Sequence, residues 1–390
     1  MSATPASAQT SGYEDVTDGI HAEAIAAITD AGVAEGCEED RYCPLEVVRR
    51  DQMASFLARA LGLEAVDDRR FDDVPVDNVH RGAINALAEA GITQGCAPER
   101  FCPDAPVSRA EMASFLARGF DLGPAQEQYF HDVGDTHDQN AQRLAEAGIS
   151  DGCDDLGLSF CPAQSVRREQ MAAFLARAQE LVAPVSIPML LQPGDEGPAV
   201  QALQQRLENH DYWVGPIDGG YGTLTEQAVL AIQKVHGLLR DGIYGPSTRA
   251  AVADPQPPST ASSEGYVVEF DEDRQLVLLV QDGVAGQIFH ASGGNEDSYE
   301  YAGTTYVAET PNGSWDVYRE IDGWRTSHLG ELYRPKYFHT AGIAIHGSNS
   351  VPAQAASHGC VRVSIDAMDW LWANEALPIG ADVLVYGSPT

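Results

Sequence analysis

The sequence predicts a multidomain fold with an α-helical region of three repeats, a small three-helix bundle and a mainly-β C-terminal domain. Three observations support this prediction. Residues 13–183 contain one pattern three times, residues 188–253 show helical spacing of apolar side chains, and strand-like runs separated by Asp/Gly turns begin at Tyr266. A chain of 390 residues is also longer than one hydrophobic core usually organises.

The composition argues against some classes of function. The chain has 58 acidic and 24 basic residues, which gives a formal net charge of −34 at pH 7. Proteins that bind nucleic acids need a basic surface, so a nucleic-acid partner is not expected. The 44% hydrophobic content is typical of folded protein. We therefore interpret the acidity as a solubilising surface.

The N-terminal repeat has a period of about 59 residues and occupies about 13–62, 71–120 and 130–181. Each copy opens with an Asp-Val pair, continues through a histidine to a helix that ends at a glycine, and closes with a second, amphipathic helix. Met, Phe and Leu at i, i+3 and i+4 mark the buried side of that second helix. The corresponding positions are Asp15, Asp73 and Asp132; His21, His80 and His137; and Arg50, Arg109 and Arg168.

Six of the seven cysteines form close pairs within the repeats: Cys37/Cys43, Cys96/Cys102 and Cys153/Cys161. Each repeat offers only two sulfurs without C-x-x-C spacing, which disfavours zinc and favours three local disulfides. Disulfides imply an oxidising, extracytoplasmic setting. Ala6-Ser7-Ala8 looks like a signal-peptidase site without an apolar segment before it. We expect that an export signal has been removed or begins upstream.

The repeats resemble S-layer homology repeats, the three-fold modules that anchor bacterial proteins to wall-attached polymers. Two departures are evident. Ala22, Arg81 and Asp138 stand where the family usually has Trp, and only Ser108-Arg109-Ala110-Glu111 approximates its Thr-Arg-Ala-Glu motif. The resemblance implies an anionic wall polymer as partner. Arg50, Arg109 and Arg168 either grip that polymer or hold the helix starts in place.

Residues 188–253 form a second module with two similar turns, Asp218-Gly219 and Asp241-Gly242. Thr225 and Thr248 follow these turns and are predicted to be helix N-caps. The module resembles the peptidoglycan-binding domain type 1, a three-helix bundle, which implies wall binding; a degenerate scaffold is the alternative. The Pro/Ser-rich residues 254–263 then predict an extended, semi-flexible tether.

Cys360 carries the candidate chemistry of the C-terminal domain, residues 264–390. It is the one cysteine beyond residue 161, it lies in Ser357-His358-Gly359-Cys360-Val361-Arg362, and His346 lies upstream. An unpaired cysteine on its own is usually a buried, inert side chain. Two nearby imidazoles and an arginine instead predict a lowered thiol pKa and a nucleophilic thiolate. The small Gly359 lets the backbone present N–H groups to an oxyanion.

His346, thirteen intervening residues and Cys360 within Ser-His-Gly-Cys-Val-Arg resemble the L,D-transpeptidases of the bacterial cell wall, with their YkuD-type catalytic domain. Thr310-Pro311-Asn312-Gly313 is similar to the family's Thr-Pro-x-Gly turn. The run from Tyr337 to Ile345 resembles the strand that delivers the catalytic histidine. The resemblance implies 3→3 crosslinking of peptidoglycan stem peptides through a cysteine thioester, without cofactor or metal.

The resemblance also implies a role for each site residue. Cys360 is the nucleophile, and His346 moves the proton while the Gly347 carbonyl orients its ring. Oxyanion donors are expected around His358 and Gly359, although His358 alternatively orients the loop. Three residues are expected to contact substrate: Arg362, Ser357 and Tyr337. For Arg362 an internal ion pair is the alternative, and Tyr333 to Tyr337 are expected in a substrate-covering lid.

Two other functions remain open at this stage. Water in place of an acceptor amine would make the same site an L,D-carboxypeptidase or endopeptidase. A structural wall-anchoring protein with a vestigial C-terminal domain is the third interpretation. The intact pair of His346 and Cys360 argues against it, and the expected partners are peptidoglycan stem peptides and glycan.

Overall fold

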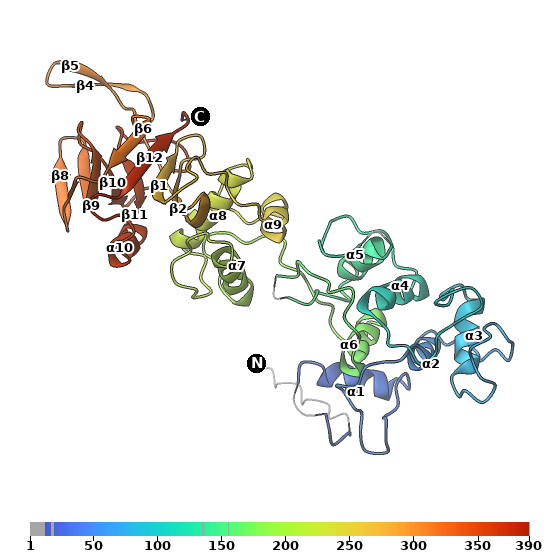
Figure 1. Ribbon diagram of the computed structural model, residues 1–390. Helices are drawn as coiled ribbons and strands as arrows, with labels where there is room; N and C mark the ends of the chain where they lie inside the picture. The colour runs from blue at the N-terminus through green and yellow to red at the C-terminus, as the bar shows by residue number, and fades with distance from the viewer. Residues whose placement is uncertain (1–11, 17–18, 135, 155, 390) are drawn as a thin grey trace, which may run out of the picture. The chain divides into compact units, whose positions relative to one another are not determined.

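The computed structural model describes residues 12–16, 19–134, 136–154 and 156–389, so Ala6-Ser7-Ala8 lies outside the described residues. The chain divides into two compact units, Met1–Ile187 and Pro188–Thr390 (Figure 1). The first unit is helical, and the second contains a helical bundle followed by a mainly-β domain. The predicted fold class is therefore confirmed.

The first unit contains two helices from each repeat. They are α1 (Ala22–Asp30), α2 (Arg50–Ala60), α3 (Arg81–Glu89), α4 (Arg109–Gly119), α5 (Asp138–Glu146) and α6 (Arg168–Ala178). The segments before α2, α4 and α6 meet in a closed ring of backbone hydrogen bonds. Val48 N–H donates to Val166 O (2.9 Å), Val107 N–H to Val48 O (3.0 Å), and Val166 N–H to Val107 O (2.9 Å). The three repeats therefore share one core.

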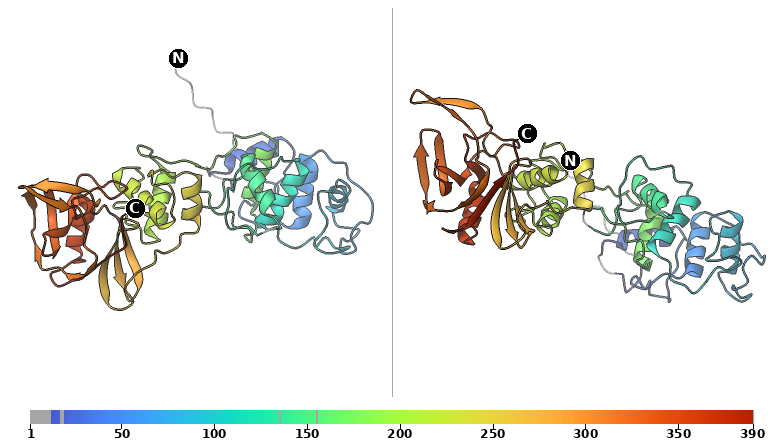
Figure 2. Two further views of the ribbon diagram at one scale, coloured as in Figure 1. Left: turned by 90° about the horizontal axis from the view of Figure 1, so that it is seen from above. Right: turned by 45° about the horizontal axis from the view of Figure 1, so that its top comes forward.

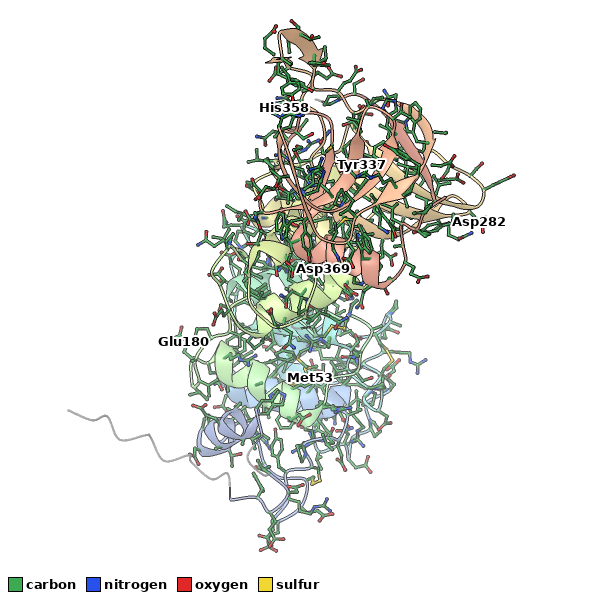
Figure 3. The ribbon with its side chains drawn as sticks, turned by 90° about the vertical axis from the view of Figure 1, so that its left-hand side faces the viewer. Met53, Glu180, Asp282, Tyr337, His358 and Asp369 are labelled. Atoms are coloured by element: carbon green, nitrogen blue, oxygen red, sulfur yellow. A yellow bond between two sulfur atoms is a disulfide. The ribbon has the colours of Figure 1, made fainter. Side chains whose placement is uncertain are left out.

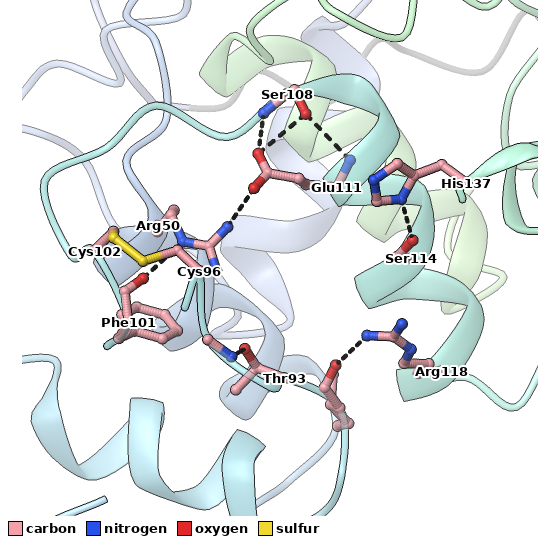
Figure 4. A network of polar contacts seen from close by, with 12 residues as sticks. Arg50, Thr93, Cys96, Phe101, Cys102, Ser108, Glu111, Ser114, Arg118 and His137 are labelled. Atoms are coloured by element: carbon pink, nitrogen blue, oxygen red, sulfur yellow. Dashed lines mark hydrogen bonds and ion pairs between the residues drawn. A yellow bond between two sulfur atoms is a disulfide. The ribbon is translucent and has the colours of Figure 1, made fainter. Parts of the chain in front are cut away.

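The repeated arginines hold this ring together. Each donates through Nε to a carbonyl in the disulfide loop of another repeat: Arg50 to Phe101 O (2.9 Å), Arg109 to Phe160 O (2.6 Å) and Arg168 to Tyr42 O (2.7 Å). Each guanidinium also lies over the ring of that same aromatic residue. Arg50 forms an additional ion pair with Glu111 (Figure 4). All three arginines are at most 4% exposed. They therefore hold the helix starts in place, which was the structural alternative, and do not bind a polymer.

The Asp-Val pairs and the cysteine pairs also have structural roles. The three predicted disulfides are present: Cys37–Cys43, Cys96–Cys102 and Cys153–Cys161. The aspartates accept hydrogen bonds from two backbone N–H groups of the same loops; Asp73, for example, accepts from Phe101 N (2.7 Å) and Cys102 N (2.8 Å). Each loop is thus fixed both by its own bridge and by a carboxylate from the start of its repeat.

Two of the three repeated histidines make a hydrogen bond to a serine of the preceding repeat, and the third has no such partner among the described residues. His80 Nδ1 is hydrogen-bonded to Ser55 Oγ (2.7 Å), and His137 Nδ1 to Ser114 Oγ (2.8 Å, Figure 4). The third repeat has Ala173 in place of the serine. His21 Nδ1, its expected partner, is buried without a hydrogen bond among the described residues. An unsatisfied buried nitrogen lowers stability.

Ala173→Ser is therefore expected to stabilise the first unit by about 1 kcal/mol, because the new hydroxyl completes the bond to His21. Chemical denaturation of the full chain, monitored by a signal from the helical unit, measures the change in the free energy of unfolding. Ser114→Ala is the matched control and is expected to destabilise by a similar amount, since His137 loses the same bond. A destabilising Ala173→Ser would show that the site has no room for the hydroxyl.

The bundle of the second unit consists of α7 (Pro198–Glu208), α8 (Thr223–Val235) and α9 (Pro246–Ala253). It contains one polar motif twice. Gln204 Nε2 donates to Asp218 Oδ1 (3.0 Å) and Thr225 Oγ1 (2.9 Å). In the second copy, Gln233 Nε2 donates to Asp241 Oδ1 (2.8 Å) and Thr248 Oγ1 (3.0 Å). The prediction of threonine N-caps is wrong, because Gly222 and Gly245 occupy the N-cap positions and the threonines lie in the first turn.

The mainly-β domain has two sheets and one helix around a shared core. The first sheet has the order β3-β2-β1-β12-β6, and the second has the order β11-β10-β9-β7 with β8 beside β9. β4 and β5 form a separate hairpin. The elements are β1 (Tyr266–Asp271), β2 (Leu276–Gln281), β3 (Val284–His290), β4 (Ser298–Tyr301), β5 (Thr304–Val307), β6 (Gly313–Asp316), β7 (Arg319–Glu320), β8 (Trp324–Ser327), β9 (Gly330–His339), β10 (Ile343–Ser348), β11 (Val361–Ser364), α10 (Ile365–Ala373) and β12 (Asp382–Tyr386).

The bundle packs directly on the first sheet, with α8 against β3 (Figures 1 and 2). Trp213 N–H donates to Ile288 O (3.0 Å), and the Trp213 and Phe289 rings lie 5.6 Å apart. At the end of the predicted tether, residues 254–263, the N–H groups of Ala261 and Ser262 donate to Glu269, which fixes this end to the catalytic domain. Proline and serine content predicted the extended backbone but not this buried carboxylate.

Candidate active site

The second sheet brings the two candidate catalytic residues together. β10 and β11 are parallel neighbours, with Ile345 opposite Val361 and His346 opposite Arg362. Because side chains alternate along a strand, His346 and Arg362 project from the same face. Cys360 comes two residues before Arg362, so its side chain belongs to that face as well. The run from Tyr337 to Ile345 was expected to be one strand that positions the catalytic histidine. It belongs to two strands, β9 and β10, joined by a turn after His339.

His346 is held in one tautomer by the backbone. The ring is 4% exposed, and Nδ1 lies 2.8 Å from Gly347 O. A carbonyl only accepts hydrogen bonds, so Nδ1 carries the proton and Nε2 is left as the base. Burial lowers the pKa of His346 to about 4, although the bond to Gly347 opposes this and Arg362 adds to it. At neutral pH the imidazole is therefore uncharged.

The surroundings of Cys360 favour the protonated thiol. The side chain is partly exposed, and Sγ donates to Gly342 O at 3.8 Å. Burial of the sulfur raises the pKa of Cys360, and the Ala344 N–H and the Arg362 charge only partly offset this. The expectation of a lowered thiol pKa is thus wrong. Arginine is near, but the desolvation of the sulfur outweighs it.

Alkylation of Cys360 by iodoacetamide is expected to be slow at pH 7 and to accelerate about tenfold per pH unit up to pH 9, because only the thiolate reacts. Mass spectrometry of the modified chain measures the rate at each pH. The six disulfide-bonded cysteines provide an internal background. A fast rate that does not change between pH 5 and pH 8 would instead reveal a preformed thiolate–imidazolium pair.

The loop before Cys360 is shaped by buried hydrogen bonds. Ser357 is 2% exposed, its Oγ donates to Cys360 O (2.6 Å), and it accepts from Gly359 N–H (3.0 Å). Ser357 therefore positions the cysteine and does not face substrate, contrary to expectation. The same bond occupies the Gly359 N–H, so Gly359 is not an available oxyanion donor.

Gly359 has a backbone conformation that other residues avoid. Its φ is +119°, and an added Cβ would lie 2.6 Å from Glu309 O. Thr310, from the predicted Thr-Pro-x-Gly turn, fixes this point because its Oγ1 donates to Gly359 O (2.9 Å) and accepts from Gly294 N–H (2.9 Å). Sequence reasoning noted the motif but not this positioning role, which requires contact between distant segments.

His358 and Tyr337 have different neighbours. The exposed His358 ring packs edge-on against Tyr299 of β4 with centroids 4.9 Å apart. In Figure 3 it lies below the β4–β5 hairpin, whereas Tyr337 lies among the strands. Tyr337 is buried in β9 near Arg319. Tyr333 to Tyr337 belong to β9 of the second sheet, so a substrate-covering role of this run stays a prediction. Alternating apolar residues in this run fit a strand.

Arg362 has no carboxylate partner within the described part of the chain, and its guanidinium is only partly buried beside Cys360. Burial lowers its pKa, and the cysteine opposes that shift. Most other arginines of this acidic protein form ion pairs, for example Arg334 with Asp369 at 2.8 Å. The internal ion pair considered as the alternative is therefore absent, and the free guanidinium favours a substrate carboxylate.

The site is also supported from the bundle, which the sequence did not indicate. Lys234 of α8 is 2% exposed, and its Nζ donates to Gln275 O (2.9 Å) and Ala291 O (3.0 Å) and contacts His290 Nδ1 (2.8 Å). His290 Nε2 in turn lies 2.9 Å from Val351 O, in the segment between His346 and Cys360. A lysine near the end of an amphipathic helix usually looks like a solvent-exposed residue.

Three family models match successive parts of the chain. The S-layer homology domain matches residues 70–113, a putative peptidoglycan binding domain matches residues 196–252, and an L,D-transpeptidase catalytic domain matches residues 265–385. The first match falls on the repeat whose Ser108-Arg109-Ala110-Glu111 is closest to that family's motif.

The crystal structure of an L,D-transpeptidase (residues 123–326) from Xylanimonas cellulosilytica is 49% identical to this chain. It aligns over 53% of this chain and 100% of its own, with a TM-score of 0.50. The surface-layer 125 kDa protein of Lysinibacillus sphaericus is 36% identical over 100 residues, and a probable N-acetylmuramoyl-L-alanine amidase of Bacillus licheniformis is 28% identical over 165 residues. The chain spans 8% and 46% of the lengths of these two curated relatives.

Proposed function

Because the chain belongs to the L,D-transpeptidase family, we propose that it forms 3→3 peptidoglycan crosslinks through a thioester on Cys360. The observation that carries the proposal is the parallel pair β10 and β11, which places a neutral histidine, a thiol and an unpaired arginine on one face of a sheet. These groups supply a base, a nucleophile and a carboxylate anchor.

The first half of the reaction forms the thioester. The Cys360 thiol turns from Gly342 O toward His346 Nε2, which takes the proton as sulfur attacks the carbonyl carbon of the third stem residue. The N–H groups of His358 and Cys360 stabilise the oxyanion, and one such donor is worth about 10²–10³ in rate. The C–N bond then breaks, and His346 gives the proton that it took from the sulfur to the leaving amine nitrogen. D-alanine departs, and His346 is neutral again.

The second half transfers the acyl group. The side-chain amine of another stem attacks the thioester carbonyl and gives a proton to His346 Nε2. The C–S bond breaks, and the sulfur regains its proton from the imidazolium. Arg362 holds the carboxylate of a stem in both halves. We propose that Tyr337, which is buried in β9, contacts the substrate; burial raises the pKa of its hydroxyl, and the Arg319 charge opposes this shift.

The remaining domains indicate association with the cell wall, since S-layer homology and peptidoglycan-binding domains bind wall polymers. Of the residues that the structure describes, none form a helix long and apolar enough to span a membrane. We propose that the bundle and the repeats keep the enzyme at its polymeric substrate. Any anionic polymer bound by the repeats must contact residues other than the ring-holding Arg50, Arg109 and Arg168.

Incubation with disaccharide-tetrapeptides, followed by mass spectrometry, tests the proposed reaction. A product with the mass of two substrates less one D-alanine is expected, and Cys360→Ala should abolish it while the melting temperature stays close to that of the native chain. A monomer that has lost D-alanine would show hydrolysis instead. Unchanged substrate, with the fold intact, would support the wall-anchoring alternative.

A further inference from the structure

A pocket of about 290 Å³, lined by both polar and apolar residues, lies inside the second unit, where the bundle meets the catalytic domain. The bundle contributes the first turns of α8, including Leu224 and Gln227, and the neighbouring Asp218. The catalytic domain contributes the end of β10 and the start of α10, including Ser348, Asn349 and Asp366. Its volume is at the lower end of the range found for small-ligand sites.

The pocket lies on the same two strands as the candidate catalytic residues. Ser348 is opposite Ser364 at the far ends of β10 and β11. Alternation along β10 places Ser348 on the face that carries His346. Four residues of strand at a rise of about 3.3 Å separate Cys360 from Ser364, so the pocket begins roughly 13 Å from the sulfur. One extended wall fragment is long enough to reach both.

Gln227 indicates that the pocket takes a ligand with amide groups. It is only 8% exposed, it lines the pocket, and its carboxamide has no hydrogen-bond partner among the described residues. The carboxamide atoms are open to the pocket, and the group has both donors and an acceptor to offer a ligand. Asn349 adds a second carboxamide at the exposed edge. Another amide is the natural complement of such groups.

The charges of the pocket favour a neutral ligand. Asp218 uses Oδ1 for Gln204 and the Gly220 N–H, which leaves Oδ2 free, and Asp366 lies in the first turn of α10. These carboxylates oppose an anionic group. The first turn of α8, which begins after an N-cap glycine without a side-chain cap, provides N–H donors and a positive end that oppose a cation. Hydroxyl groups satisfy both kinds of partner.

We infer that this pocket binds an N-acetylated sugar of the wall glycan and so aligns the attached stem with Cys360. The acetamido group pairs with Gln227, sugar hydroxyls donate to Asp218 and Asp366, and Leu224 contacts the apolar side of the ring. This inference rests on the proposed function for the identity of the polymer. The bundle would then contact the substrate that is being processed, in addition to attaching the enzyme to the wall away from the catalytic site.

Binding is tested with the full chain carrying Cys360→Ala, so that no turnover is needed. Calorimetric titration with the N-acetylglucosamine–N-acetylmuramic acid disaccharide is compared with titration by the sugar-free tetrapeptide. Asp218→Asn and Gln227→Leu are each expected to weaken disaccharide binding about tenfold, the loss of one good hydrogen bond to a ligand. Asp241→Asn is the matched control, because Asp241 has the same bonds in the second copy of the motif and does not line the pocket.

The exposed Asn349→Ala provides a further variant that does not depend on the interior of the bundle. Failure of the disaccharide to bind, or equal binding by the Asp218, Gln227, Asn349 and Asp241 variants, would overturn the inference. Binding of the tetrapeptide alone, weakened by Gln227→Leu, would assign the pocket to the stem and also overturn it. These outcomes are independent of the crosslinking assay, since a chain that forms no crosslink still reports its affinity for sugar.

Discussion

Replacing His346 with asparagine is expected to lower turnover of stem peptides about 10²–10⁴-fold, the usual contribution of a positioned general base. Asparagine keeps a nitrogen at the position of Nδ1, so the bond to Gly347 O is retained while the base at Nε2 is lost. Product formation followed by mass spectrometry measures the effect. Turnover unchanged in this variant would exclude His346 as the base.

The same variant is expected to be more resistant to acid. Burial lowers the folded-state pKa of His346 to about 4, below the ordinary histidine value of about 6.5. Between these values the unfolded chain binds a proton that the folded chain does not, so stability falls as the pH drops from 6.5 to 4. The loss amounts to about 3 kcal/mol. His346→Asn removes it, whereas His328→Asn, at an exposed position, should not. Denaturation at pH 7 and pH 4 makes the comparison, and equal acid losses in all three proteins would contradict a buried neutral imidazole.

Local chemistry in the sequence was sufficient to predict much of the architecture. The paired cysteines predicted three disulfides, because each pair is separated only by a short loop. Helix ends at Gly32, Gly91 and Gly148 followed from the preference of glycine for positive φ, which all three adopt. The bond from His346 to Gly347 O was expected because Gly347 is the matching position in the family it resembles and no acidic residue is near in sequence.

Features that depend on distant contacts could not be predicted in this way. The sequence alone does not distinguish a polymer-binding role from a structural role for Arg50 and its two equivalents. The hydrogen bonds that they make between repeats decide for the structural role. The pKa of Cys360 depends on how far the fold removes the sulfur from water, which the neighbouring residues do not reveal. Ser357 was expected to contact substrate from its place in the motif that resembles the family, yet the loop turns it inward.

Lys234 is the clearest example of a residue whose role depends on contacts distant in sequence. Its replacement with methionine is expected to destabilise the second unit by about 3 kcal/mol. Methionine fills a similar volume, but three buried acceptors lose their donor: Gln275 O, Ala291 O and His290 Nδ1. The damage extends toward the catalytic loop, because Gly293 O, two residues after Ala291, accepts from Ser357 N–H (2.8 Å). Turnover is therefore expected to fall about tenfold, as positioning of the nucleophile is relaxed.

Arg240→Met is the matched control for Lys234→Met. It removes one positive charge that acts on Lys234, and Arg240 donates to Asp273 O (3.1 Å) at an exposed position. A change within about 0.5 kcal/mol is expected for this variant. Denaturation curves and initial rates of the two variants at one pH provide the comparison. Equal stability and equal rates would show that the bundle merely adjoins the catalytic domain, whereas a loss confined to Lys234→Met would establish that it supports the cysteine loop.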